Sequence, residues 1–576
     1  MSQSPGTSPC RDCCPDATTS RRTILRSAVA LGVAAHAARS RSTRAQSTPT
    51  SGVPSYIPKP DTEILIPIDG PLTQDTQSFR VLTARNDEVT DLDDNRFTQW
   101  MQNQTNVHVE WDVVPEVDMQ SKLNVMLSSG DIPDIVFGFV NPSQLLLYGS
   151  QGIFLRLNEL IEEHAPRARR IFEMYPAARA ACSAPDGSIY SMPGWGECFH
   201  CTFNQKLWLY QPWLVQLGLA LPTTTDDLEQ VLRAFKDQDP NGNGQADEIP
   251  LSGSLSKSHS QLPSNLMNAF VFNPGEPYLI VEDGAVTPIY VTDGWKEGLK
   301  YLHRLYADGL IDPQILTQDE DQLQRLGNDP DNVVLGGVLG SSAGVAVSIS
   351  NEPGARWAEY VPVPPLVGPA GVQYAGWLPY LPAYAAAPIT QACPDPALAV
   401  RWIDSFYWQE ATLRLERGVL DQEWRWAREG ELDVKGDQAI WKLLIVHAEP
   451  SNVSWAGTGP MYMSQNLFNG VAIDETARDL NVETILYDAS KNLYEPHKPP
   501  MEMVLPPLAL TMDQAITIAD PEATIVQYVK QMLAQFVRGD TDIDTGWDAY
   551  AGTIEQMGLA AYIQAYQDAY DASAGS

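Results

Sequence analysis

Residues 107–137 read VHVEWDVVPEVDMQSKLNVMLSSGDIPDIVF. This stretch predicts a strand over 107–114, a helix over 117–127 and a short buried strand over 134–137. Just upstream, an apolar run over 79–83 and a helical pattern over 91–104 give the same alternation of strand and helix. Strands that alternate with helices form parallel sheets, so the predicted fold class is α/β.

The remainder of the chain is richer in helical patterns. Helices are predicted over 295–306 and 396–408, and two or three more over 520–570, with breaks at Gly539 and Gly558. The sequence shows no internal repeat. At 576 residues, the chain has room for two to four domains.

The first 45 residues are typical of an export signal. Arg21 and Arg22 precede a short apolar run over 28–35, and small residues follow at Thr43 and Ala45, where cleavage is expected. Paired arginines are characteristic of the twin-arginine route, which exports folded proteins. No cysteine directly follows the apolar run, so no lipoprotein anchor is indicated. The alternative to an export signal is a disordered basic tail or a short buried helix. Residues 46–77 are rich in Ser, Thr and Pro and predict a flexible linker.

Acidic residues outnumber basic residues by 72 to 38, which gives a net charge of −34, or −39 once residues 1–45 are removed. A surface of this charge repels phosphate backbones and anionic lipids, which argues against nucleic acid or a membrane surface as the partner. No apolar run is long enough to span a bilayer. We therefore expect a protein located outside the cytoplasm, in the periplasm or at the cell surface.

Four cysteines follow the signal: Cys182, Cys198, Cys201 and Cys393. The sequence Cys198-Phe199-His200-Cys201 lacks the second Cys pair or spaced His pair of a typical zinc site. A disulfide among Cys182, Cys198 and Cys201 is the better interpretation in an oxidising compartment, with its pairing open.

Several segments resemble one family in their joint order. They are 129–135 (SGDIPDI), 152–161, 186–190, 213–224, 305–313 and 547–550. Over about residues 79–571 the chain resembles the extracellular solute-binding proteins of bacterial ABC sugar importers, in particular the large oligoalginate-binding branch. The resemblance implies a periplasmic-binding-protein-like fold, in which two α/β lobes close by a hinge around a ligand in the cleft. It also implies delivery to the permease subunits of an ABC transporter, no catalysis, and a monomer.

The resemblance divides the chain into two lobes. The N-terminal lobe is expected at 78–195 and about 378–445, and the C-terminal lobe at about 196–377 and 446–576. The bound cargo is then expected to be an oligosaccharide.

The segment 239–250 reads DPNGNGQADEIP. Oxygen-bearing side chains stand at positions 1, 3, 5 and 9 with glycine at 6, which matches the first part of an EF-hand calcium loop. Position 12 is Pro250, so the usual final glutamate is missing. By the resemblance, a structural calcium ion has the following ligands: Asp239, Asn241, Asn243, the Gln245 carbonyl, Asp247 and Glu248. The alternative is a surface turn, which these residue types also favour.

Two patterns favour a competing interpretation, a secreted hydrolase. Residues 340–344 match G-x-S-x-G around Ser342, with His447 and His497 downstream, and Ser254 with Lys257 matches S-x-x-K. Ser342 lies far from the first strand, and the motifs that accompany S-x-x-K are missing. We therefore expect no enzyme. A binding protein for a non-sugar ligand such as a peptide is the third possibility.

A sugar-binding cleft needs aromatic platforms and a few fixed polar groups. Four rings near the expected lobe crossings or among small residues are candidates, and four polar side chains on loops accompany them. The rings are Trp195, Trp377, Tyr380 and Trp455, and the polar residues are Glu197, Asn141, Arg85 and Asp87. Core packing is the alternative for each ring. The negative charge and the many aromatic residues predict a neutral oligosaccharide rather than a uronate.

Overall fold

The computed structural model describes residues 67–574, with gaps at 69, 87, 116–117, 139, 256–257, 351, 381–382, 446–449, 475–477, 479 and 509. The predicted export signal 1–45, most of the predicted linker 46–77, Asp87, Lys257 and His447 lie outside the described residues.

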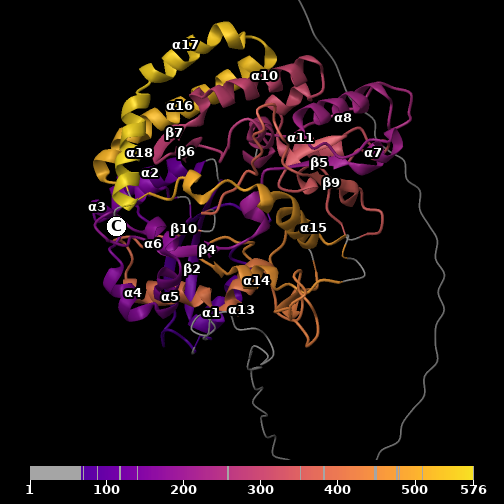
Figure 1. The fold of residues 1–576 in the computed structure, drawn as a ribbon. Coiled ribbons are helices and arrows are strands. Elements are labelled where there is room, and N and C mark those ends of the chain that lie inside the picture. Colours follow the sequence, from indigo (N-terminus) through magenta and orange to yellow (C-terminus); the bar gives the residue numbers. More distant parts are fainter. Residues whose placement is uncertain are drawn as a thin grey trace, which may run out of the picture. The chain divides into compact units, whose positions relative to one another are not determined.

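The chain is a mixture of helices and short strands (Figure 1). The helices are α1 (Arg96–Thr105), α2 (Met119–Ser129), α3 (Pro142–Ser150), α4 (Asn158–His164), α5 (Pro166–Met174), α6 (Pro176–Cys182), α7 (Gln211–Leu217), α8 (Thr225–Asp237), α9 (Leu262–Leu266), α10 (Asp293–Ala307), α11 (Glu320–Gly327), α12 (Pro396–Asp404), α13 (Gln409–Arg417), α14 (Gln465–Asn469), α15 (Val482–Ala489), α16 (Met512–Arg538), α17 (Ile543–Gln556) and α18 (Leu559–Ala574). The strands are β1 (Gln77–Ala84), β2 (Val107–Val114), β3 (Ile135–Phe137), β4 (Met192–Gly196), β5 (Lys206–Tyr210), β6 (Leu279–Glu282), β7 (Ala285–Pro288), β8 (Gly337–Gly340), β9 (Tyr360–Val363), β10 (Ala383–Ala387), β11 (Trp424–Trp426), β12 (Trp441–Leu443) and β13 (Tyr462–Met463).

The first sheet confirms the predicted parallel arrangement. β1 pairs in parallel with β2 on one side and with β3 on the other, and α1 and α2 connect the strands. Alternate residues of β1 point to opposite faces: Phe79 and Val81 join one hydrophobic cluster, whereas Leu82 and Ala84 join another. Both faces of this sheet are therefore covered, as parallel sheets require.

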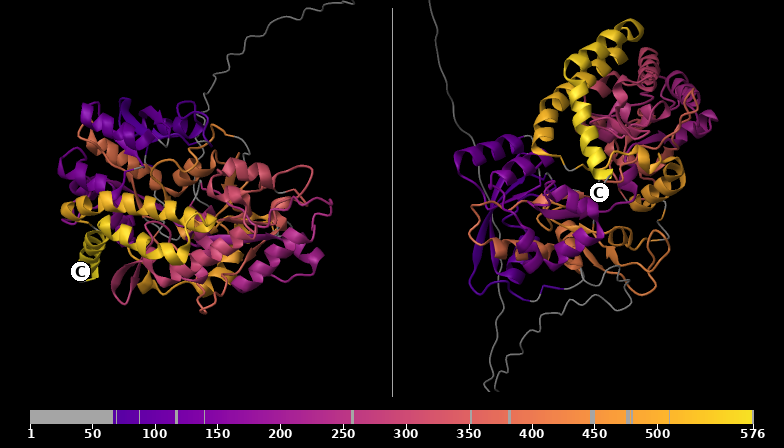
Figure 2. Two further views of the ribbon diagram at one scale, coloured as in Figure 1. Left: turned by 90° about the horizontal axis from the view of Figure 1, so that it is seen from above. Right: turned by 60° about the vertical axis from the view of Figure 1, so that its left-hand side comes forward.

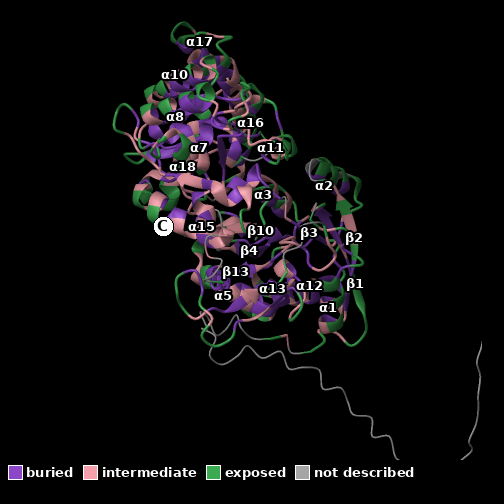
Figure 3. Cartoon of the chain, turned by 90° about the vertical axis from the view of Figure 1, so that its right-hand side faces the viewer, coloured by how far each residue is buried: buried purple, intermediate pink, exposed green. Residues whose placement is uncertain are grey.

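A second sheet lies further along the chain and is antiparallel. The central strand β5, with sequence KLWLY, is buried at every residue and pairs with β8 and β9. A third sheet brings together three segments that are far apart in sequence: β4 pairs with β10 in antiparallel fashion and with β13 in parallel fashion. The strand β4 is largely buried, whereas β10 is buried only at its last two residues, Ala386 and Ala387 (Figure 3).

The C-terminal helices follow the sequence pattern. α16 packs along α10 and α18, and Figure 2 shows the C-terminal helices α16, α17 and α18 in yellow. Gly539 and Gly558 both adopt positive φ angles (79° and 96°) and separate the three helices, so the predicted breaks are confirmed. Within the described part of the chain, no helix combines the length and apolarity needed to cross a bilayer.

The hydrophobic core is divided. One cluster gathers residues between Leu207 and Leu366 together with residues from Leu486 to Ala565. A second cluster gathers residues between Phe79 and Trp195 together with residues from Ala387 to Tyr462. The chain thus passes between the two cores near residues 196–206 and 367–386, and again after Tyr462.

Candidate functional site

The passages between the two cores meet in a small cluster of aromatic residues. Phe203 follows β4, Tyr494 follows α15, and both are buried together with Ala375. Phe199 and Trp377 pack against this group and remain half-buried. Three segments distant in sequence therefore contribute to one aromatic surface.

A pocket of about 220 Å³ opens on this surface. Trp377 forms one wall, with its ring stacked 6.3 Å from that of Phe203. The Lys498 ammonium lies 5.0 Å from the centre of the Trp377 ring, within the range of a cation–π contact. The lining residues are Glu197, Cys198, Phe199, Thr202, Phe203, Trp377, Pro379, Gln465, Glu495 and Lys498.

Polar groups of the pocket are fixed by neighbouring elements. The Glu197 carboxylate accepts a hydrogen bond of 2.7 Å from the Gln465 backbone amide at the start of α14. Glu495 accepts from the Lys491 ammonium at 2.6 Å. Aromatic faces beside a few fixed carboxylate, amide and ammonium groups match the chemistry of a sugar, which has apolar C–H faces ringed by hydroxyls.

The wall that contains Cys198 is a cross-linked turn. Cys198 and Cys201 form a disulfide at the short 3₁₀ helix His200–Phe203, labelled η2. The buried Lys206 ammonium donates to the carbonyl oxygens of His200, at 3.1 Å, and of Phe203. Burial lowers the pKa of Lys206 to about 7.

Of the pairings left open by the sequence, the structure selects Cys198–Cys201, while Cys182 and Cys393 are free and buried.

Two of the predicted ligand residues line the pocket: Trp377 and Glu197. Tyr380 is half-buried against the core that contains β5, three residues after Trp377, and is not among the lining residues. Burial and the nearby Tyr570 raise its pKa.

Trp195 and Trp455 lie in the core. Trp195 is 7% exposed and stacks on Tyr175 at 3.9 Å between ring centres. Trp455 is fully buried, and its Nε1 donates to the Thr98 hydroxyl at 2.8 Å. The core-packing alternative holds for Trp455, because no face of its ring is open to a ligand in this structure.

The predicted polar residues Asn141 and Arg85 are not among the residues that line the pocket. The Asn141 side chain caps α3 in a capping box with Gln144, so its side-chain oxygen already accepts a hydrogen bond from the Gln144 backbone amide. Arg85 follows β1 with an exposed side chain, and its backbone amide donates to Val114 at 2.7 Å.

Sequence reasoning missed most of the pocket. Phe199 lies within the Cys-x-x-Cys motif and Phe203 lies two residues after it, so the motif was a usable signal. Glu495, Lys498 and Gln465 carry no local signal, because they reach the pocket only through the tertiary fold.

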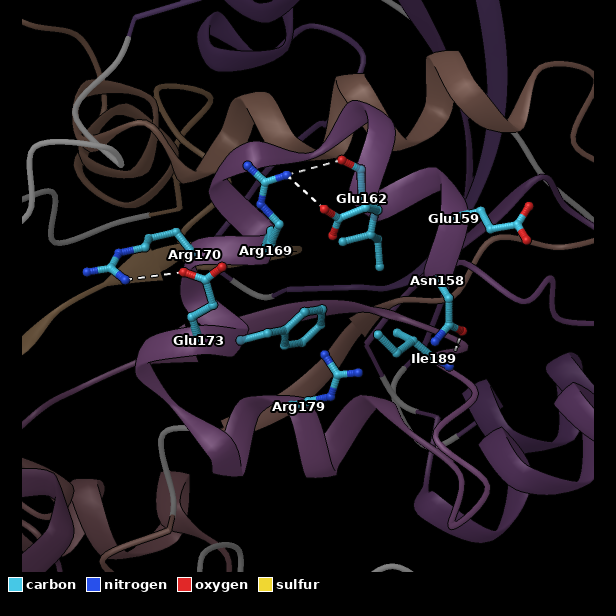
Figure 4. Close-up of a pocket in the computed structure, with 10 residues that line it drawn as sticks. Asn158, Glu159, Glu162, Arg169, Arg170, Glu173, Arg179 and Ile189 are labelled. Atoms are coloured by element: carbon cyan, nitrogen blue, oxygen red, sulfur yellow. Dashed lines mark hydrogen bonds and ion pairs between the residues drawn. The ribbon is translucent and has the colours of Figure 1, made fainter.

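A larger hollow of about 760 Å³ lies elsewhere, among α4, α5 and α6 (Figure 4). Its rim carries charged pairs, such as Arg169 with Glu162 at 3.3 Å and Arg170 with Glu173 at 3.2 Å. Its one lining ring, Phe172, is buried, and no predicted site residue contributes. The smaller pocket is therefore the better candidate for a sugar.

The predicted metal loop follows α8, and amide groups of the loop donate hydrogen bonds to its carboxylates. The Asn241 and Asn243 amides both donate to the Asp247 carboxylate at 2.9 Å, and Asp239 accepts from the Gly244 amide at 3.0 Å. Within the described part of the chain, Asp239 Oδ1 and Glu248 Oε1 are buried and have no hydrogen-bond partner. Burial, Asp247 and Asp239 raise the pKa of Glu248. The residues present therefore fit a hard cation, which would satisfy the orphaned oxygens.

The serine of the G-x-S-x-G segment has a structural role. Ser342 follows β8 and its Oγ accepts a hydrogen bond of 3.1 Å from the Gly344 amide, which starts a 3₁₀ turn over Ala343–Val345. The strand–turn–helix of a nucleophile elbow is not formed at this serine.

A family model described as bacterial extracellular solute-binding protein matches residues 86–407. The chain belongs to this family. This solute-binding protein is 30% identical over 519 residues to the fructooligosaccharide ABC transporter substrate-binding protein FusA of Streptococcus pneumoniae serotype 4, a match that covers 87% of the chain and 92% of FusA. It is also 23% identical over 224 residues to the polygalacturonan/rhamnogalacturonan-binding protein YtcQ of Bacillus subtilis, over 38% of the chain and 42% of YtcQ.

Solved structures agree with this assignment. FusA in complex with kestose superposes with a TM-score of 0.73 at 26% identity, over 86% of this solute-binding protein and 99% of that chain. An EF-hand mutant of FusA in complex with fructo-nystose gives the same values. These matches confirm the periplasmic-binding-protein-like α/β fold, and they confirm a solute-binding protein of an ABC transporter rather than an enzyme.

Proposed function

We propose that this protein captures a neutral oligosaccharide and presents it to the permease subunits of an ABC importer. The observation that carries the proposal is the similarity to FusA over 87% of this chain and 92% of FusA, which is named for fructooligosaccharides and has been solved with kestose. The aromatic pocket at the passages between the two cores supports it, because Trp377 and Phe199 provide flat apolar surfaces beside fixed polar groups.

Charge favours a neutral sugar. Glu197 and Glu495 place carboxylates at the pocket, and the Lys498 ammonium is positioned over the Trp377 ring. The chain as a whole is strongly acidic. A uronate oligomer would bring further negative charge to a surface that already repels it.

Calorimetry tests the substrate class. We expect kestose or nystose to bind with micromolar or tighter affinity, about −8 kcal/mol or better, and oligogalacturonate to bind at least tenfold more weakly. Tight binding of oligogalacturonate, the class named for YtcQ, would overturn the charge argument. Failure of every neutral glycan in a thermal-shift screen that also contains peptides would overturn the sugar assignment.

We propose two lobes that close on the ligand. Packing of Trp455 and Tyr462 with the core of β1–β3 supports an N-terminal lobe of about 78–195 and 378–472, which extends the expected boundary at 445. The C-terminal lobe then comprises about 196–377 and the chain from about 482 onward. In the calorimetry samples, ligand should also reduce the radius of gyration measured by small-angle scattering, because closure is a rigid rotation about the passages between lobes.

We further propose that the loop after α8 binds a structural calcium ion. The ligands would be Asp239, Asn241, Asn243, the Gln245 carbonyl, Asp247 and Glu248. The two orphaned carboxylate oxygens, on Asp239 and Glu248, support this assignment. The existence of a solved EF-hand mutant of FusA also supports it.

Calcium removal should lower the melting temperature by several degrees, because an ion present at a hundred times its Kd stabilises the folded state by about 2.7 kcal/mol. Differential scanning calorimetry with and without chelator measures the shift. Asp247→Asn should abolish the shift, whereas Asp237→Asn, exposed at the end of α8, should leave it intact. An unchanged melt of the wild type, with no metal in the purified protein, would contradict the assignment.

We propose export by the twin-arginine route, followed by function as a monomer in the periplasm or at the cell surface. Replacement of Arg21 and Arg22 by lysine should leave the uncleaved precursor in the cytoplasm, as detected by immunoblotting of cell fractions. Normal export of this variant would indicate another route.

A further inference from the structure

The disulfide turn beside the sugar pocket brings three metal-binding side chains together. Cys198, His200 and Cys201 each offer one ligand atom, and these three atoms lie within 4.8 Å of one another. Cys198 and His200 are buried, whereas Cys201 is half-exposed. The sequence contains all three residues but no second Cys pair or spaced His pair, and the fold places the His200 ring close to both sulfurs.

Neighbouring groups hold this turn in place. Lys206 Nζ donates to the carbonyl oxygens of His200 and Phe203, and the Cys201 amide donates to Cys198 Sγ at 3.2 Å. A carboxylate oxygen of Glu483, from the first turn of α15, lies 3.7 Å from His200 Nδ1. This separation is longer than a hydrogen bond, so Glu483 would support His200 as a metal ligand by closing onto Nδ1, which would orient the ring and leave the other nitrogen free.

We propose that the reduced form of this turn binds one zinc ion, or a similar thiophilic divalent cation, through Cys198, His200 and Cys201. A water molecule supplies the fourth ligand on the half-exposed side of Cys201. Two thiolates and one imidazole are a common zinc ligand set. Zinc–sulfur bonds of about 2.3 Å in a tetrahedron separate the two sulfurs by about 3.8 Å, so the sulfurs must move apart after reduction.

The chemistry requires an external dithiol. Its first thiolate attacks one sulfur of the Cys198–Cys201 bond and forms a mixed disulfide, and its second thiolate then displaces the cysteine. The reductant leaves as a disulfide, and the protein gains two electrons and two protons as two thiols. Both thiols lose their protons when the metal binds. The oxidised turn has no thiolate to offer, so its metal affinity is switched by redox state. This site does not depend on which sugar the pocket accepts.

Zinc titration of the processed protein, without residues 1–45, tests the proposal, because that segment carries three further thiols at Cys10, Cys13 and Cys14. The protein is reduced with dithiothreitol under anaerobic conditions, freed of reductant, and titrated against a chromophoric zinc chelator. We expect one tight equivalent in the reduced protein that the oxidised protein lacks; the oxidised sample also corrects for zinc held by the acidic loop after α8. Cobalt should give a thiolate-to-metal absorption band in the reduced protein.

Variants separate the site from the other thiols. Cys201→Ser should abolish the reduced-state equivalent, His200→Asn should weaken it at least a hundredfold, and Glu483→Gln should weaken it by about tenfold. Cys393→Ser should have no effect, because that thiol is elsewhere in the core. Circular dichroism establishes whether each variant is folded. If His200→Asn does not fold, the zinc affinity of Glu483→Gln provides the test instead. Equal zinc binding by oxidised and reduced protein, or unchanged binding in both His200→Asn and Glu483→Gln, would overturn the proposal.

Discussion

Replacement of Trp455 by alanine should lower the free energy of unfolding by about 3–5 kcal/mol. The ring is fully buried and packs edge-on against Phe97 and Trp111, at 4.8 and 5.0 Å between ring centres. Its indole N–H donates to the Thr98 hydroxyl, so truncation leaves a cavity and removes this buried hydrogen bond, although Thr98 still donates to the Leu92 carbonyl. Because native proteins are stable by only about 5–15 kcal/mol, this is a large fraction of the total. Urea unfolding followed by circular dichroism measures it.

Trp455→Phe is the matched variant, because it keeps most of the ring volume and loses the N–H. It should cost clearly less stability than Trp455→Ala. Under conditions where Trp455→Ala remains folded, its sugar affinity should equal that of the wild type. A stable Trp455→Ala protein with weakened sugar binding would contradict this assignment and would indicate that the Trp455 ring contacts the ligand.

Replacement of Trp377 by alanine should weaken sugar binding tenfold or more, with little loss of stability. The ring is half-buried, forms a wall of the pocket and has the Lys498 ammonium near its face. Loss of one stacking platform removes on the order of 1.4 kcal/mol of binding free energy, which corresponds to tenfold in Kd. Calorimetry with kestose or nystose measures the change.

Trp426→Ala is the control for Trp377→Ala. Trp426 is also half-buried, but it lies in the hairpin of β11 and β12 and does not line the pocket. Its removal should leave the affinity unchanged. Equal affinity of the wild type and Trp377→Ala would assign the Trp377 ring to the core.

Local patterns were sufficient for much of the fold. The strand predicted over 107–114 is found over the same residues, because its residues suit a strand and a left-handed Asn106 (φ 59°) ends the preceding helix. Helix ends were less accurate. The helix expected from residue 91 begins at Arg96, because the Asn95 side chain, an N-cap, accepts from the Phe97 amide.

The site was harder to predict, and two tryptophans show why. Trp377 was predicted from its place near an expected lobe crossing, whereas Trp455 stands among small residues, which predict an accessible ring. At Trp455 the following Ala456 and Gly457 instead adopt positive φ angles (47° and 80°), and a Cβ at Gly457 would lie 2.8 Å from a Glu416 oxygen. The small residues Ala456 and Gly457 are therefore required by a tight turn and do not make the Trp455 ring accessible. The distinction depends on contacts with α13, which no local pattern reveals.

The sheet of β4, β10 and β13 has a consequence for biogenesis. Its three strands come from residues 192–196, 383–387 and 462–463, so neither core is encoded by one continuous piece of chain. The other core depends equally on late residues: the Val286 amide, for example, donates to Gln567, 281 positions away. A growing polypeptide cannot complete either half until most of it has left the ribosome, and such long-range closure slows folding. We therefore expect nascent chains of this protein to remain dependent on chaperones until synthesis is nearly finished.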